Sequence, residues 1–143
     1  MGRKEDRQNI RKAKIGIVII LLVPLLVYAY SSFITLHIKE IEMKIKVDDV
    51  IGINVENSSL NFGRTYPGSL VFRKINLTNN YNFPIKISIL NTGDISQFVY
   101  VSENDFLLKP KELRQVTYYV EVPKDAEYRN FTGISKVIFK RKL

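Results

Sequence analysis

The chain has 143 residues, 45% of them apolar, with no cysteine, one histidine and a formal net charge of +8. Once a membrane segment is subtracted, this length leaves room for one globular domain and not for two. The absence of cysteine excludes disulfides, thiolate metal ligands, thiol nucleophiles and lipoprotein-type acylation.

The positive charge is concentrated at the two ends of the chain. Residues 1–14 contain six Lys/Arg and two Asp/Glu, and Lys140, Arg141 and Lys142 form a basic tail. The residues between these segments are nearly neutral in sum. A nucleic-acid-binding domain needs basic side chains gathered on the domain itself, so the charge distribution argues against a nucleic-acid partner.

The segment from Ile15 to Leu36 has no formally charged residue over 22 positions. As a helix it would be about 33 Å long, which matches a bilayer hydrocarbon core of about 30 Å. A buried helix of a soluble protein would show a polar stripe at helical spacing, and none occurs between Ile15 and Tyr28. The sequence predicts a transmembrane helix over residues 15–36.

The charges around this segment predict its orientation. Cations in short flanking segments favour the cytoplasmic side, and the segment after Leu36 mixes both signs of charge. We therefore expect a basic cytoplasmic tail over residues 1–14, a single span in the cell membrane, and an extracytoplasmic C-terminal domain. The topology determinants are Arg3, Lys4, Arg7, Arg11, Lys12 and Lys14.

A cleavable signal peptide is the alternative to a retained anchor. A basic start, an apolar run and small or aliphatic residues at Val27 and Ala29 resemble a cleavage site after Ala29. The uncharged stretch continues past Ala29 to Leu36, which favours the anchor.

Residues 37–49 show two patterns at once. Ile41, Met43, Ile45 and Val47 alternate as in a strand, whereas Glu40 with Lys44 has the spacing of a helical ion pair. The sequence leaves helix and strand open here, and it predicts either a stalk or a first strand that ends at Asp48-Asp49.

Residues 50–143 read as short strands separated by turn residues. Seven or eight such runs at spacings of about 8 to 12 residues, with no helical stretch among them, predict an all-β domain with a β-sandwich architecture. The runs lie at residues 51–55, 60–62, 70–78, 85–89, 98–101, 106–108, 116–122 and 133–140.

The same region resembles the immunoglobulin-like sandwich modules of archaeal and bacterial cell-surface proteins. The resemblance rests on Phe62-Gly63 and Pro67-Gly68 around the second strand and on the loop from Pro123 to Gly133 before the last one. It covers about residues 50–140 and points toward archaea. It implies an Ig-like fold, and it says little about function because such modules serve as stalks, adhesive units and assembly partners.

Three sequons identify candidate N-glycosylation sites at Asn57, Asn76 and Asn130. Asn57 and Asn130 fall in predicted turns, where an acceptor must lie, whereas Asn76 falls in a predicted strand and is the weakest candidate. Turn-forming asparagines without a glycan are the alternative interpretation.

No catalytic, cofactor-binding or metal-binding set is predicted. His37 is the single histidine, and neither Asp48-Asp49 nor the run Glu103-Asn104-Asp105 has the ligand spacing of a calcium loop. Tyr119, which points away from the face formed by Val116, Tyr118 and Val120, and Tyr128, in a loop, are predicted as contacts with a protein partner.

The first functional hypothesis is a non-enzymatic, membrane-anchored cell-envelope protein whose Ig-like domain binds a surface or membrane protein. The second is a pilin- or archaellum-related filament or assembly subunit, although Lys14-Ile15-Gly16 departs from the usual processing pattern of such subunits by one position. The third is a domain secreted after cleavage at Ala29. No small-molecule substrate is expected.

Overall fold

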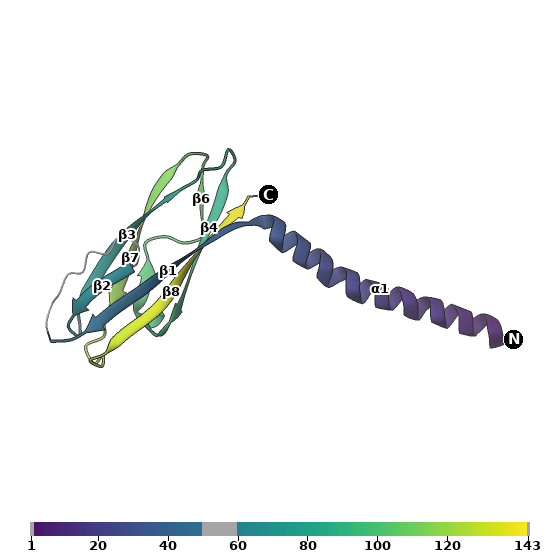
Figure 1. The fold of residues 1–143 in the computed structure, drawn as a ribbon, viewed down its shortest axis with the longest axis horizontal. Coiled ribbons are helices and arrows are strands. Elements are labelled where there is room, and N and C mark those ends of the chain that lie inside the picture. The colour runs from purple at the N-terminus through teal and green to yellow at the C-terminus, as the bar shows by residue number, and fades with distance from the viewer. Residues whose placement is uncertain (1, 50–59, 143) are drawn as a thin grey trace. The chain divides into compact units, whose positions relative to one another are not determined.

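The computed structural model describes residues 2–49 and 60–142, with side chains described at residues 12, 14–30, 34–49 and 60–142. The chain divides into two compact units, residues 1–34 and 35–143. The first is the helix α1 (Gly2–Ile34) and the second is built from strands. Figure 1 shows both units, and each is described separately below.

The helix α1 continues through Pro24, and its apolar side chains between Ile15 and Tyr30 are exposed. Among the described residues, no helix meets the combined requirements of length and apolar character for crossing a membrane. The predicted helix over 15–36 is two residues too long at its C-terminal end. Thr35 and Leu36 belong to the first strand instead, where Thr35 pairs with Lys140.

The described part of the second unit contains eight strands in two sheets, with one short 3-10 helix (Figure 1). One sheet, here called sheet A, has the order β2-β1-β8-β4-β6, and the other, sheet B, has the order β3-β7-β5. The elements are β1 (Thr35–Val47), β2 (Leu60–Thr65), β3 (Leu70–Thr78), β4 (Ile85–Gly93), η1 (Asp94–Phe98), β5 (Val99–Val101), β6 (Phe106–Leu108), β7 (Leu113–Glu121) and β8 (Asn130–Arg141).

The two-sheet, all-β prediction is confirmed. The predicted strand over residues 51–55 lies outside the described residues. Strand β4 runs through Asn91 and Thr92, which the sequence assigned to a turn, because both pair with β8 opposite Ser135 and Ile134.

Strand β1 lies inside sheet A, between β2 and β8. Ile41, Met43, Ile45 and Val47 are buried, and the charged residues between them face outward. Burying an aliphatic side chain stabilises the folded state by about 1.5–3 kcal/mol, whereas an ion pair along a helix contributes about 0.2–0.5 kcal/mol. Burial therefore favours a strand over a helix in this segment. Glu40 makes its ion pair across the sheet with Lys136, at 3.0 Å.

The core lies between the two sheets and is mainly aliphatic. The hydroxyl of Tyr118 in sheet B and that of Ser135 in sheet A are 2.8 Å apart, which makes a buried hydrogen bond between the sheets. Burial raises the pKa of Tyr118 above its ordinary value of 10.0. This bond gives an otherwise apolar core one directional contact.

Strands β4 and β8 approach closely where Gly93 pairs with Gly133. A Cβ atom on Gly133 would lie 2.2 Å from the carbonyl oxygen of Thr92 and 2.7 Å from Cγ2 of Ile95. Gly93 has φ 95°, a conformation that glycine adopts without strain. The glycine pair therefore permits the tight passage from β4 into η1.

The register defines two ends of the sandwich. The proximal end is the one at which β1 begins, and it comprises Thr35, Lys86, residues 140–142 and the loops over residues 79–84 and 109–112. The distal end is the one at which β1 ends, and it comprises residues 46–49, 64–69 and 121–130 together with Asp94.

Candidate functional site

Three aromatic side chains form one cross-strand row on the outer face of sheet B, here called the aromatic row. Phe72 on β3 pairs with Tyr119 on β7, and Tyr119 pairs with Tyr100 on β5. Cross-strand partners project from the same side of a sheet. Alternation along β7 sends Tyr118 and Val120 into the core, and it therefore turns Tyr119 outward.

The rings of the aromatic row contact one another. Tyr100 and Tyr119 are stacked, with ring centroids 5.1 Å apart and an interplanar angle of 14°, and Phe72 lies 6.5 Å from Tyr119 at 46°. Phe72 is 54% exposed and Tyr100 is 45% exposed, so the row presents ring surface to solvent. Contacts between the rings restrict their motion, which lowers the entropy lost when a partner binds.

Polar side chains border one side of the aromatic row. An open groove of about 510 Å³ lies beside Tyr100, and Gln97, Glu121 and Lys124 contribute to its lining. Leu70, paired with Glu121, exposes a further aliphatic side chain next to Phe72. An aromatic centre with a polar border is the usual composition of a protein-binding surface.

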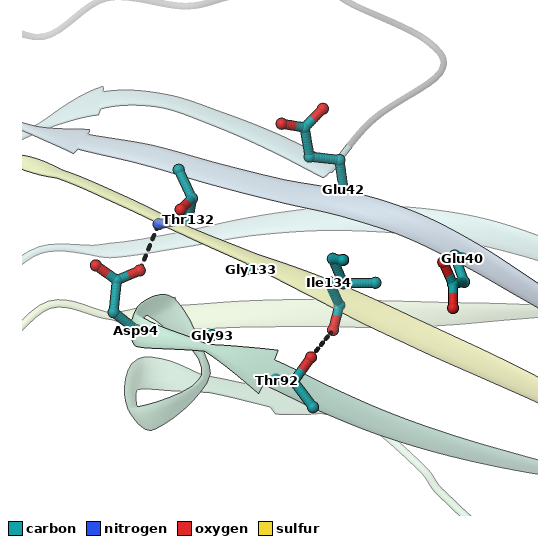
Figure 2. A pocket seen from close by; sticks show the side chains of 8 residues that line it. All are labelled: Glu40, Glu42, Thr92, Gly93, Asp94, Thr132, Gly133 and Ile134. Carbon is teal, nitrogen blue, oxygen red and sulfur yellow. Dashed lines mark hydrogen bonds between the residues drawn. The ribbon is translucent and has the colours of Figure 1, made fainter.

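A second, shallow groove of about 710 Å³ lies on the outer face of sheet A. Figure 2 shows its lining, with Glu40 and Glu42 on β1, Ile134 on β8, Thr92 on β4 and Asp94 at the start of η1. Gly93 and Gly133 contribute backbone to the lining of this groove.

Two of the three carboxylates in this groove are already engaged within the fold. Glu40 pairs with Lys136, and Asp94 pairs with Arg129 at 2.7 Å and accepts the backbone N–H of Thr132 at 2.6 Å (Figure 2). The Thr132 N–H, followed by Arg129, holds the pKa of Asp94 below its ordinary value of 3.8. Asp94 therefore stays ionised and links the start of η1 to the beginning of β8.

Within residues 2–49 and 60–142, no group of three or more His, Cys, Asp or Glu side chains is placed to hold a metal ion. His37 is exposed and its ring lies 5.8 Å from that of Phe139. Asn104 uses its amide to bond the backbone N–H and carbonyl of Ile89, so the run Glu103-Asn104-Asp105 supports the edge of β4.

The structure places the two tyrosines predicted as partner contacts in different surroundings. Tyr119 is the centre of the aromatic row, whereas Tyr128 is a single exposed ring at the distal end. The sequence interpretation selected neither Phe72 nor Tyr100 as a contact. Their outward direction depends on their pairing with Tyr119, which no local pattern reveals.

The candidate sequons fall on different parts of the chain. Asn76 is exposed on β3 and accepts a hydrogen bond from Gln115 at 3.3 Å, and Asn130 is exposed at the start of β8. Asn57 lies outside the described residues. Glycosylation at these positions stays a prediction.

The cations before the apolar run lie on the first turns of α1. Lys12 and Lys14 are exposed, and the side chains of Arg3, Lys4, Arg7 and Arg11 lie outside the described set. Their role in orientation stays a prediction.

Comparisons of the chain with protein-family models, with curated proteins and with solved structures give no match. The likeness to Ig-like surface modules therefore rests on the sequence motifs alone.

Proposed function

We propose that this chain is a non-enzymatic cell-envelope protein, anchored in the membrane by its N-terminal helix, whose Ig-like sandwich binds a surface or membrane protein. The observation that carries this proposal is the aromatic row of Phe72, Tyr119 and Tyr100 on the outer face of sheet B.

The aromatic row favours a protein partner for two reasons. Tyrosine and phenylalanine supply large contact area with few rotatable bonds, and buried aromatic anchors dominate the binding energy of many interfaces. The row also crosses a short sheet from the edge strand β3 to the edge strand β5, so a partner has access across its full width. Gln97, Glu121 and Lys124 supply a polar border that selects orientation.

The anchor is supported by the uncharged run from Ile15 and by the basic segment before it. From Ile15 to the end of α1 at Ile34, the helix is about 30 Å long at 1.5 Å per residue, which suits the hydrocarbon core. The positive-inside rule then puts the sandwich on the outer side of the membrane.

The N-terminus of the mature protein distinguishes this proposal from its alternatives. Mass spectrometry should find an intact start at Met1 or Gly2 for the anchor, a start near Ile17 for a pilin-like subunit, and Tyr30 for a secreted domain. Cleavage after Ala29 would leave β1 whole, because β1 begins at Thr35. A start at Tyr30 would therefore reject the anchor while leaving the sandwich complete.

The binding surface is tested with a photo-crosslinking amino acid in intact cells. One probe replaces Phe72, and the matched control replaces Leu90, which is equally exposed at 54% but lies on β4 in sheet A. We expect a discrete protein adduct from the Phe72 position alone, and loss of that adduct when Tyr119→Ala is added.

The adduct identifies a partner whose affinity can then be measured. Tyr119→Ala should raise the Kd for that partner by about thirtyfold, the effect of removing one interface hot spot, whereas Leu90→Ala should leave it unchanged. Equal crosslinking from both positions, or an unchanged Kd for the folded Tyr119→Ala protein, would reject the aromatic row as the binding surface.

A further inference from the structure

The two ends of the sandwich carry opposite charge. The described residues of the proximal end include six cations, and two carboxylates lie nearby, those of Asp105 and Glu112. Both carboxylates are engaged, Asp105 with Lys86 at 3.0 Å and Glu112 with Arg114. The six cations are Lys86, Lys109, Lys111, Lys140, Arg141 and Lys142.

The distal end has the reverse balance. Its described residues include six carboxylates and four cations, and several of the cations are paired there, Lys46 with Asp48 and Arg129 with both Asp94 and Glu127. The carboxylates are Asp48, Asp49, Asp94, Glu121, Asp125 and Glu127, and the cations are Lys46, Arg64, Lys124 and Arg129.

A buried asparagine holds the proximal loops together. The Asn79 side chain is fully buried, and its Nδ2 donates to the carbonyl oxygens of Phe83, Leu108 and Lys109 at 2.9 to 3.1 Å. Lys111 Nζ donates to the carbonyl of Asn80 at 2.8 Å, across the two loops. The basic residues therefore project from a preorganised base and not from two independent loops.

Aromatic rings accompany the cations at this end. Tyr81 and Phe83 stack with centroids 5.2 Å apart, and the guanidinium of Arg141 lies 4.5 Å from the centre of the Phe83 ring. Cations beside aromatic rings are the composition typical of a surface that meets lipid headgroups.

Chain connectivity places this basic end next to the membrane if α1 is inserted. A single peptide bond joins Ile34, the last residue of α1, to Thr35, which pairs with Lys140 at the proximal end. The electrostatic field of anionic headgroups extends about 8 to 10 Å at moderate ionic strength. The proximal end is therefore the part of the sandwich that follows the proposed span directly along the chain.

We propose that the proximal end binds anionic lipid headgroups of the bilayer that α1 crosses, so that the sandwich sits with its base on the membrane. This inference rests on the proposed membrane anchoring and adds a second, charge-dependent contact to it. The competing occupant is the acidic distal end of a neighbouring copy, and the experiment below separates the two.

The test uses the full chain in proteoliposomes, with insertion verified first by resistance to alkaline carbonate extraction. Because the chain has no cysteine, a single engineered one can be labelled cleanly. A fluorophore at Asn82→Cys reports on the proximal end and one at Asp125→Cys on the distal end, and a lipid with a quencher in its headgroup reports proximity. Vesicles contain phosphatidylcholine alone or a mixture with phosphatidylglycerol.

We expect strong quenching at position 82 in vesicles with phosphatidylglycerol, little at position 125, and loss of most of the position-82 signal in phosphatidylcholine or at high salt. Replacing Lys109, Lys111 and Lys142 by glutamine should abolish the dependence on lipid charge.

The matched control removes the same charge elsewhere, by replacing Arg64, Lys74 and Lys124 with glutamine, and it should retain the full signal. Equal quenching in neutral vesicles, or a signal that follows protein density in the vesicle and not lipid charge, would overturn the lipid contact while leaving the anchor intact. Release of the chain by carbonate would instead overturn the anchor itself.

Discussion

The two ends of the sandwich are closed by different chemistry. The proximal loops are centred on a neutral, fully buried amide, that of Asn79, which makes hydrogen bonds to several backbone groups. The distal end is closed by partly exposed carboxylates, chiefly Asp94, which bonds Arg129 and the backbone of Thr132. A buried amide is insensitive to salt and pH, whereas exposed ion pairs respond to both.

This difference suits the lipid contact proposed for the proximal end. Charged lipid headgroups would compete for the side chains of an exposed ion pair. A proximal end that contacts such headgroups therefore keeps its geometry best if no exposed ion pair is essential to it. At the distal end, weak ion pairs between partly exposed side chains order the loops.

Asn79→Ala should destabilise the proximal end most. It removes the donor to three carbonyl oxygens and the acceptor of the Tyr81 N–H, and buried groups without partners cost about 1–3 kcal/mol each, so we expect a loss of about 4 kcal/mol in the free energy of unfolding. Chemical denaturation measures this change in the free energy of unfolding. Asn80→Ala, at the exposed neighbour, is the control and should change stability by less than about 0.5 kcal/mol. Similar effects from both would contradict the role assigned to Asn79.

Gly133→Ala should be nearly as damaging near the distal end. The added methyl group would overlap the backbone oxygen of Thr92, which cannot move without breaking the β4–β8 ladder. We expect a loss of about 3 kcal/mol, measured as a lower midpoint of denaturation. Thr132→Ala, one residue away on an exposed position, should be close to neutral. A stable Gly133→Ala protein would mean that the two strands can separate locally.

Tyr118→Phe tests the contact that lies between the two ends. Loss of its hydroxyl leaves the buried Ser135 hydroxyl without this partner, and we expect a cost of about 1–2 kcal/mol. Adding Ser135→Ala should recover part of that cost, because both polar groups are then gone. If the variant that carries both Tyr118→Phe and Ser135→Ala is less stable than Tyr118→Phe alone, the hydrogen bond between these hydroxyls does not stabilise the core.

Acid should loosen the distal end before the proximal end. The hydrogen-bonded Lys46 ammonium lowers the pKa of Asp48 from 3.8 to about 2, and the Thr132 N–H lowers that of Asp94. Because both pKa values are lower in the folded state, their stabilisation is present above about pH 3.8 and is lost as pH falls toward 2. The effect is small because these groups are exposed.

Amide hydrogen exchange, expressed as protection factors at successive pH values, measures this acid response. Protection should fall first at Thr132 and Asp49. The pKa of Glu112 is also lowered, chiefly by its bond to the Lys109 N–H, so some acid response is expected in the 109–112 loop, but the amides bonded around Asn79 should stay protected. Simultaneous loss of amide protection at both ends would show that the two ends respond to acid in the same way.

Local pattern was sufficient for much of the fold. Alternation of apolar and polar residues located β7 and the first part of β4, and turn residues such as Pro67-Gly68 located the boundary between β2 and β3. The same alternation turned Tyr119 away from the core. Alternation depends on the two-residue repeat of a strand, which is a local property of the backbone.

The pairing between strands could not be predicted from local sequence pattern. The interior position of β1, between β2 and β8, and the end of α1 at Ile34 are decided by pairing with other strands, and so is the parallel direction of β1 and β2. The buried role of Asn79 was also hidden, because an Asn-Asn-Tyr-Asn run looks like any exposed loop until the carbonyls of residues 108 and 109 are placed around it.

Composition and the two-residue period of strands were enough to predict an all-β domain after an uncharged run near the N-terminus, because both are local properties of the sequence. The alignment of Phe72, Tyr119 and Tyr100 in one row, and the position of the basic tail beside the start of β1, became visible only in the folded protein. Both are consequences of register between strands, and register depends on how two sheets share a single core.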